Sequence, residues 1–238
     1  MLDTILFDLD GTLLPLSDTA FLELYMGLLG RRFARLGYDP KTFVQAVWAG
    51  TKAMIANDGR QSNEAVFREA FSKLVDTRGD LVYAEFEQFY REDFPGVSAS
   101  AKASPISPQI VETLKAKGYT LALATNPLFP REATRQRIAW AGLNETDFAL
   151  VTTYENSRYA KPNPLYFREV LDKLGKTPAQ CLMVGNDRRE DAVATKLGIP
   201  FFLVTDCLIN EHNLSLDTVE KGTLEDFFVK VLALPSLQ

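Results

Sequence analysis

Polar side chains suited to chemistry follow short apolar runs at four places along the chain. The first group, Asp8-Leu9-Asp10-Gly11-Thr12, comes directly after the run at 4–7. The others are Thr125-Asn126-Pro127, Lys161-Pro162-Asn163-Pro164 and Gly185-Asn186-Asp187-Arg188-Arg189-Glu190-Asp191. Carboxylate and amide oxygens suit a divalent cation such as Mg²⁺, while hydroxyl and lysine groups suit the oxygens of a phosphoryl group. The pattern therefore indicates chemistry on a phosphoryl group beside a metal ion.

The elements that carry these groups are predicted to be parallel strands. From residue 107 onward the chain alternates helix, glycine and short apolar strand, with proline early and glycine late in the helices. In an open parallel sheet, ligands bind at the carboxyl ends of the strands. We therefore expect an α/β fold, a Rossmann-like parallel sheet with helices on both faces, that gathers the four groups at one edge. The expected strands are 4–7, 119–125, 148–151, 181–184 and 201–204.

A helical insertion is expected to separate the first strand from the rest of the sheet. Phe21, Leu24, Tyr25 and Leu28 follow helical spacing, and similar patterns continue to residue 94. The stretch 95–107 is rich in serine, alanine, glycine and proline, so we interpret it as a linker. A structureless loop of this length is uncommon in a compact domain. We therefore predict an α/β core domain made of 1–15 and 96–238, and an all-helical domain at 16–95.

Composition excludes several classes of function. The chain has 238 residues and a net charge of −5, which argues against a nucleic-acid surface. It has no run of about 18 apolar residues, so we expect no membrane span. Two cysteines and one histidine make a disulfide framework or a zinc site improbable. The acidic Met1-Leu2-Asp3 start lacks the pattern of a signal peptide, so we expect a cytoplasmic protein, and the oligomeric state stays unknown.

The four ordered groups resemble the motifs of the haloacid dehalogenase superfamily. The helical insertion after the first motif is similar to the helical C1 cap of its phosphatase-type subfamily I. The resemblance implies that Asp8 is a nucleophile that forms an aspartyl-phosphate. It also implies that Asp10, which lies two residues further on, protonates the leaving oxygen and then deprotonates the attacking water.

The same resemblance implies the metal and phosphate ligands. Thr125, the backbone amide of Asn126 and Lys161 would bind the phosphoryl oxygens. Mg²⁺ would be held by the Asp8 carboxylate, the Asp10 backbone carbonyl and an acid of the last motif. The ion would offset the charge repulsion between that carboxylate and a phosphate dianion.

The last motif departs from the family pattern, which commonly begins Gly-Asp. This chain has Gly185-Asn186-Asp187 instead. Asn186 could coordinate the ion through its amide oxygen, with Asp187 bound beside it or through water. We favour Asp187 as the charged ligand, because a neutral amide contributes less to binding a dication. Asp191 is expected to orient Lys161 or the waters of the metal.

The resulting expectation is a Mg²⁺-dependent phosphomonoesterase that acts on a small phosphorylated metabolite. One alternative is a phosphomutase of the β-phosphoglucomutase type, and another is a non-catalytic phospho-acceptor or binding module. A dehalogenase is disfavoured, because its chemistry needs neither Asp10 nor a metal.

The insertion itself carries no recognisable recognition motif. We single out Arg60, in the turn Asn57-Asp58-Gly59-Arg60, as a residue that could face the active site. Tyr25 and Trp48 are interpreted as helix-packing residues, with the alternative that an aromatic residue of the insertion lines the substrate pocket.

Overall fold

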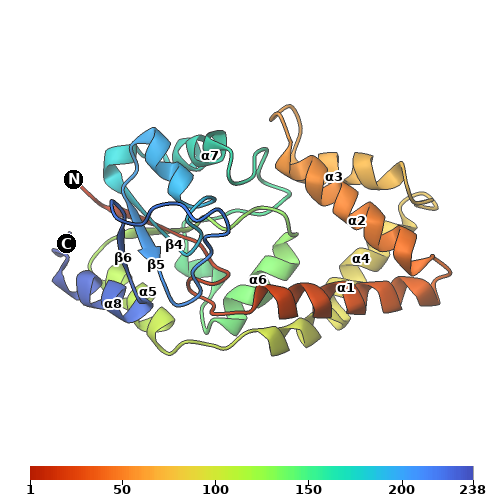
Figure 1. Ribbon diagram of the computed structural model, residues 1–238, viewed down its shortest axis with the longest axis horizontal. Helices are drawn as coiled ribbons and strands as arrows, with labels where there is room; N and C mark the ends of the chain where they lie inside the picture. Colours follow the sequence, from red (N-terminus) through yellow and green to blue (C-terminus); the bar gives the residue numbers. More distant parts are fainter. Residues whose placement is uncertain (238) are drawn as a thin grey trace.

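A six-stranded sheet forms the centre of the larger part of the computed structural model, which describes residues 1–237 (Figure 1). The strands are β1 (Thr4–Phe7), β2 (Thr120–Leu123), β3 (Leu150–Val151), β4 (Cys181–Gly185), β5 (Phe201–Val204) and β6 (Glu220–Gly222). All neighbouring pairs are parallel, in the order β3-β2-β1-β4-β5-β6. Phe7, at the end of β1, pairs with Leu123 and Val184. The residues that follow β1, β2 and β4 therefore lie along one edge.

Helices cover both faces of this sheet. They are α5 (Ile106–Ala116), α6 (Arg131–Trp140), α7 (Pro164–Leu174) and α8 (Leu224–Ala233), with the 3₁₀ helices η2 (Glu145–Asp147), η3 (Pro178–Gln180) and η4 (Ala192–Leu197). Side chains alternate between the faces of a strand. Ile5 and Phe7 accordingly pack with residues of α5 and α8, whereas Leu6 packs with residues of α7. The predicted α/β class, with helices on both faces, is confirmed.

The chain between β1 and β2 forms a separate group of helices, drawn on the right in Figure 1. It consists of α1 (Asp18–Arg35), α2 (Pro40–Ile55), α3 (Asn63–Ser72), α4 (Leu81–Glu92) and η1 (Phe94–Ser100), which we call the helical body. Ser17, Asp39 and Ser62 cap α1, α2 and α3 by accepting hydrogen bonds from backbone N–H groups. Phe33 and Phe43 stack in its interior, with ring centroids 4.0 Å apart. The helical body thus has an aromatic core of its own.

The helical body contacts the sheet part at the chain crossings, at the start of α3 and along α6, which packs against α4 and η1. The two chain crossings run side by side, because the N–H of Ser17 bonds to the carbonyl of Ser100 and the N–H of Lys102 bonds to that of Pro15. The second contact lies at the start of α3. There the buried Asn63 donates its side-chain amide to the carbonyls of Pro127 (3.2 Å) and Tyr159 (3.3 Å).

Some elements differ from those expected. The presumed linker at 95–107 contains most of η1, whose Phe94 and Val97 are buried in the helical body. The expected helix before Gly198 is the 3₁₀ helix η4. β6 and α8 had not been predicted, and no helix within residues 1–237 is long and apolar enough to span a membrane. The domain limits 1–15 with 96–238, and 16–95, stay a prediction.

Candidate active site

Asp8, Lys161 and Asp191 form a buried cluster at the carboxyl edge of the sheet. Asp8 directly follows β1 and is held by a hydrogen bond from its N–H to the carbonyl of Val184. The Lys161 Nζ lies 2.9 Å from Asp8 Oδ1 and 2.6 Å from Asp191 Oδ1. Burial opposes the charge on Lys161, but Asp191 and Asp8 outweigh it and raise the pKa of this ammonium well above its ordinary value. Three residues that are far apart in sequence therefore meet around one buried ammonium group.

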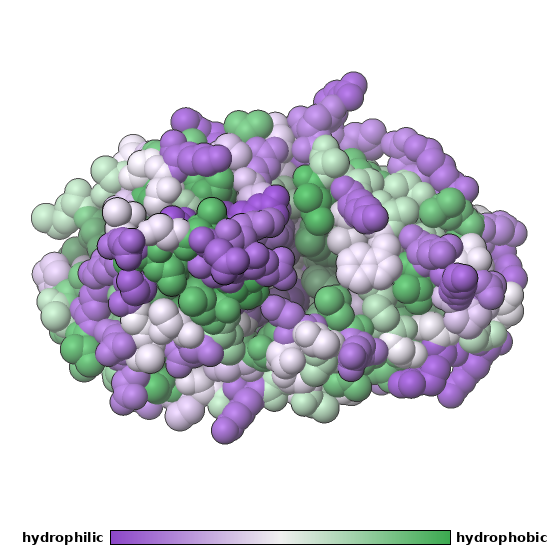
Figure 2. Space-filling model, viewed as in Figure 1, coloured by the Kyte–Doolittle hydropathy of each residue, from purple (hydrophilic) through white to green (hydrophobic). Residues whose placement is uncertain are grey.

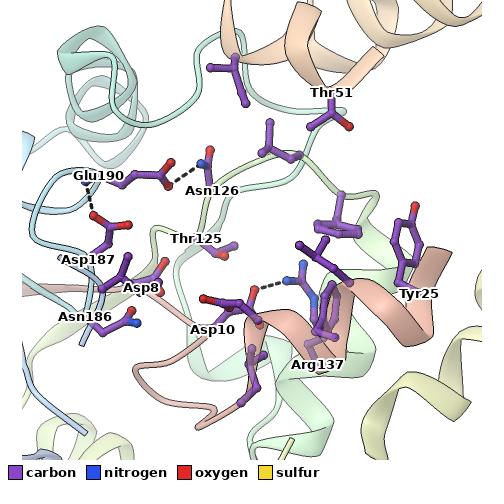
Figure 3. A pocket seen from close by; sticks show the side chains of 18 of the residues that line it. Asp8, Asp10, Tyr25, Thr51, Thr125, Asn126, Arg137, Asn186, Asp187 and Glu190 are labelled. Carbon is purple, nitrogen blue, oxygen red and sulfur yellow. Dashed lines mark hydrogen bonds and ion pairs between the residues drawn. The ribbon is translucent and has the colours of Figure 1, made fainter. Parts of the chain in front are cut away.

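Asp10 lies in the adjoining pocket and is ion-paired with Arg137 of α6 (Figure 3). Gly11, which follows it, has a φ of +81°, a conformation that permits the tight turn after β1. Desolvation raises the pKa of Asp10 to about 6, although Arg137 acts in the opposite direction. The Asp10 Oδ1 atom is buried and has no hydrogen-bond partner within residues 1–237. One oxygen is thus fixed by Arg137 and the other remains for a ligand.

Arg137 is the main site residue that sequence reasoning missed. Its side chain is almost fully buried, and its guanidinium carbon lies 4.5 Å from the centroid of the Phe129 ring. A further bond joins Arg137 Nη2 to Thr134 Oγ1 at 3.3 Å. A signal was present in the sequence, because Arg137 falls between Ala133, Thr134 and Ile138 on the buried stripe of α6. Arginine is seldom fully buried unless it is paired.

The side chains of Asn186 and Asp187, the two candidate metal ligands of the last motif, form hydrogen bonds with different groups. The Asn186 amide donates to the carbonyl of Cys207 (2.7 Å), and its oxygen accepts from the Thr12 hydroxyl (3.1 Å). A Cβ atom on Gly11 would lie 2.2 Å from this amide, so the turn after β1 packs directly on Asn186. Asp187 Oδ1 accepts hydrogen bonds from the N–H groups of residues 189 and 190, while Oδ2 accepts none within residues 1–237. Asn186 therefore supports the turn, and Asp187 keeps a carboxylate oxygen available.

Thr125 and Asn126 lie just beyond β2, at the carboxyl edge of the sheet where the sequence predicted them. Thr125 is buried and lines the pocket, and its carbonyl accepts the hydroxyl of Tyr166 (2.9 Å). The Asn126 side chain accepts from the N–H of Lys161 (3.2 Å) and donates to Glu190 (2.8 Å). Burial raises the pKa of Glu190 to about 7. Asn126 thus connects the loop of Lys161 to the last motif, a role that its sequence position did not indicate.

The side chains at this edge of the sheet determine which metal ion they could bind. Within residues 1–237, no three His, Cys, Asp or Glu side chains are grouped as a metal site. Asp8 and Asp187 nevertheless line the same end of the pocket (Figure 3). Two carboxylates completed by a backbone carbonyl and waters suit Mg²⁺, which keeps several waters when it binds to proteins. The residues present therefore fit Mg²⁺, and they do not fit zinc, which prefers cysteine and histidine ligands.

A cavity of about 670 Å³ opens between the sheet edge and the helical body, and Figure 2 shows the molecule hollowed at this place. Asp8, Asp10, Thr125, Asn126, Asn186, Asp187 and Asp191 all line it. Tyr25 and Trp48 also line it, and Tyr25 at the same time packs in the core of the helical body, as the first interpretation expected. Arg60 does not, and it pairs instead with Asp58 on the exposed surface. The expectation for Arg60 is wrong because its turn packs against Tyr159 rather than facing the pocket.

Comparison with known proteins agrees with this arrangement. A model of the haloacid dehalogenase-like hydrolase family matches residues 2–197. A phosphoglycolate phosphatase of Aliivibrio fischeri is 28% identical over 237 residues, which cover 98% of this chain and 96% of that protein. The pyrophosphatase PpaX of Anoxybacillus flavithermus is 27% identical over 195 residues, which cover 82% and 79%. A 2-haloacid dehalogenase structure from Pseudomonas syringae shares the fold, with a TM-score of 0.63, 20% identity and coverage of 98% and 99%.

Proposed function

We propose that this chain, which belongs to the haloacid dehalogenase-like hydrolase family, is a Mg²⁺-dependent phosphatase that cleaves monoesters of small phosphorylated molecules. The observation that carries this proposal is the Asp10 carboxyl group beside Asp8. Burial raises its pKa to about 6, above the ordinary value of an aspartate, which favours a proton on this carboxyl group. An ester oxygen needs a proton as it leaves, whereas a halide leaves as an anion. A positioned acid at this point therefore favours phosphate esters over haloacids. Relatives named as phosphatases agree with this choice.

The reaction follows from the positions of Asp8 and Asp10. An Asp8 carboxylate oxygen attacks phosphorus, the bond from phosphorus to the ester oxygen breaks, and Asp10 gives its proton to that oxygen. The product is an alcohol and a phosphorylated Asp8. Asp10, now ionised, removes a proton from a water molecule that attacks the same phosphorus atom. The bond between Asp8 and phosphorus then breaks, and inorganic phosphate leaves.

Three groups are proposed to hold the phosphoryl oxygens. The Lys161 ammonium lies against Asp8, where it offsets negative charge on the incoming phosphate. Thr125 offers its hydroxyl group from the same pocket. The side chain of Asn126 is already bonded to Lys161 and Glu190, so its backbone N–H is the group that we assign to the phosphate. Asp191 positions Lys161 through their 2.6 Å contact.

The Asp8 carboxylate, the Asp10 backbone carbonyl and Asp187 are proposed to hold Mg²⁺. When bound, the ion supplies positive charge that reduces the repulsion between Asp8 and a phosphate dianion. Asn186 is a weaker candidate ligand than Asp187, because its amide is held by Cys207 and Thr12.

Hydrolysis of p-nitrophenyl phosphate tests this proposal directly. We expect release of nitrophenol that requires Mg²⁺, that stops with EDTA and that Asp8→Asn abolishes, because an amide is not a nucleophile toward phosphorus. Asp58→Asn, an exposed aspartate paired only with Arg60, serves as the matched control and should retain full activity. Full activity in Asp8→Asn would exclude the nucleophile assignment.

The mutase alternative differs only in where the phosphoryl group goes. Given a hexose 1-phosphate, a phosphatase releases free phosphate, whereas a mutase forms the 6-phosphate. Sugar hydroxyls need hydrogen-bond partners, and the wall of the helical body that faces the pocket is largely apolar. This observation supports hydrolysis over transfer to a sugar.

A further inference from the structure

The helical body presents apolar side chains to the pocket that are not used for core packing. Leu22 is 38% exposed, Trp48 39% and Ile55 42%, and all three line the cavity. Exposed large apolar side chains that gather in a concave site mark a binding surface. Phe67 of α3 and Phe129 of the sheet part continue the same wall. The region opposite Asp8 is therefore built to contact an apolar group.

The hydroxyl groups that the helical body presents on this wall are already bonded within the protein. The hydroxyls of Tyr25 and Tyr90 are 2.9 Å apart and bond to each other. The Thr51 hydroxyl donates to the carbonyl of Val47 at 3.0 Å. These three hydroxyl groups are therefore not free to bind the hydroxyls of a polar substrate.

The charges around the pocket are unsuited to a second anionic group. Arg137 is the one lysine or arginine among the described residues that line the cavity, and Asp10 already neutralises it. Burial, together with repulsion from Asp8, Asp187 and Glu211, raises the pKa of Asp18, which also lines the cavity. A carboxylate buried without a cation carries a large desolvation cost. The acids that line the cavity are Asp8, Asp10, Asp18, Asp187, Glu190, Asp191 and Glu211.

From these observations we propose, building on the proposed phosphatase function, that the preferred substrate is a phosphate monoester of a largely apolar alcohol without a second anionic group. Its phosphoryl group lies at Asp8, and its apolar part lies against Leu22, Trp48 and Ile55. A cavity of about 670 Å³ accommodates such a group in addition to the phosphate. Substrates with a second anionic group, such as phosphoglycolate or pyrophosphate, are poor by comparison. This specificity differs from the activities for which the relatives are named.

A series of n-alkyl phosphates from methyl to hexyl tests the proposal, because the leaving alcohols have closely similar basicity. We expect kcat/KM to rise by up to about fourfold per methylene, the factor for complete burial of each CH₂ group. Phosphoglycolate and 3-phosphoglycerate, which both carry a carboxylate, should be cleaved less efficiently than butyl phosphate. A flat series, or a preference for either charged ester, would overturn the specificity while leaving a phosphatase. Absence of cleavage of every ester would instead overturn the proposed function.

One variant with a matched control locates the apolar site. Trp48→Ala should reduce the ratio of hexyl to methyl phosphate efficiency about tenfold, in line with the loss of a large buried contact. Leu74→Ala, an exposed leucine outside the pocket, should leave the ratio unchanged. An unchanged ratio in Trp48→Ala would contradict the proposed position of the apolar group.

Adding a cation to the same wall should shift the preference. Ile55→Arg is expected to raise the efficiency for phosphoglycolate relative to butyl phosphate, because the new guanidinium would pair with the substrate carboxylate. Leu81→Arg, at an exposed position outside the pocket, should have no such effect. Equal behaviour of the two arginine variants would contradict the inference, and thermal unfolding of both proteins verifies that they are folded.

Discussion

Arg137 is the residue through which the fold controls Asp10. Its guanidinium group is buried between Asp10 and the Phe129 ring, and it is further bonded to Thr134. These contacts leave it little freedom, so the carboxyl group that it holds is fixed in direction. Arg137 is thus a positioning residue, since it acts on the substrate through Asp10.

Replacing Arg137 by methionine should impair proton transfer while keeping the packing against Phe129. We expect turnover of an alkyl phosphate to fall about 10²- to 10⁴-fold, the usual contribution of general acid–base catalysis. The loss should be much smaller for p-nitrophenyl phosphate, whose leaving group departs without a proton. Steady-state rates with both esters measure the difference.

Arg135→Met, on the same helix and paired with Glu132 at the surface, is the control. Equal losses with both esters would assign Arg137 a structural role only.

The position of Asp8 follows from strand register, because it comes directly after β1, whereas Lys161 and Asp191 lie beyond the ends of β3 and β4 and were placed by their motifs. Residues that end neighbouring parallel strands must lie at one edge, whatever the intervening chain does. Arg137 and the side-chain bonds of Asn126 could not be predicted in this way. Their partners depend on how α6 and the loop of Lys161 pack, which no short-range pattern specifies. A buried arginine on the apolar stripe of α6 was the single available signal.

At the scale of elements, the close approach of α2 and α3 determines the shape of the pocket wall. A Cβ atom on Gly50 of α2 would lie 2.4 Å from the ring of Phe67 on α3. Trp48, Thr51 and Ile55 are carried by α2 around this contact, and Phe67 itself lines the pocket. The separation of the two helices therefore also sets the position of the apolar wall.

Gly50→Ala should destabilise the protein by about 1–3 kcal/mol, the usual cost of overpacking a filled interior. Gly27→Ala is the matched control, because Gly27 also lies within a helix but its added methyl group would meet only Arg31 at 3.8 Å. That change should be stabilising by about 0.5–1 kcal/mol, since alanine has the higher helix propensity. Chemical denaturation of both variants measures the two effects. A stable Gly50→Ala protein would contradict the tight α2–α3 contact.

Elements with strong periodicity were predicted better than short or polar ones. The helices of the insertion were expected because apolar residues recur at helical spacing and caps precede them. β6 was missed because Glu220 and Lys221 are exposed, so this edge strand shows no apolar run. η1 was interpreted as linker because its serines, glycine and proline resemble a loop. Its burial depends on Phe94 and Val97, which contact helices distant in sequence.

For the whole molecule, Mg²⁺ should contribute to stability as well as to catalysis. A ligand that binds only the folded state at a hundred times its dissociation constant adds about 2.7 kcal/mol. We therefore expect Mg²⁺ to raise the midpoint of thermal unfolding and EDTA to reverse the effect. Asp187→Asn should reduce the response, whereas Asp217→Asn, an exposed residue outside the pocket, should not. A full response in Asp187→Asn would show that the ion is held without this carboxylate.

The hydrogen bonds at the start of α3 affect how substrates reach the pocket and how products leave it. Asn63 ties the far end of the helical body to Pro127 and Tyr159, while the chain crossings tie the near end. Helix α6 adds a further connection, because Gln136 donates a hydrogen bond to the carbonyl of Tyr90 on α4. A wider separation of the two parts would therefore break the Asn63 and α6 contacts together, and an ester too large for the present opening would turn over no faster than these contacts open.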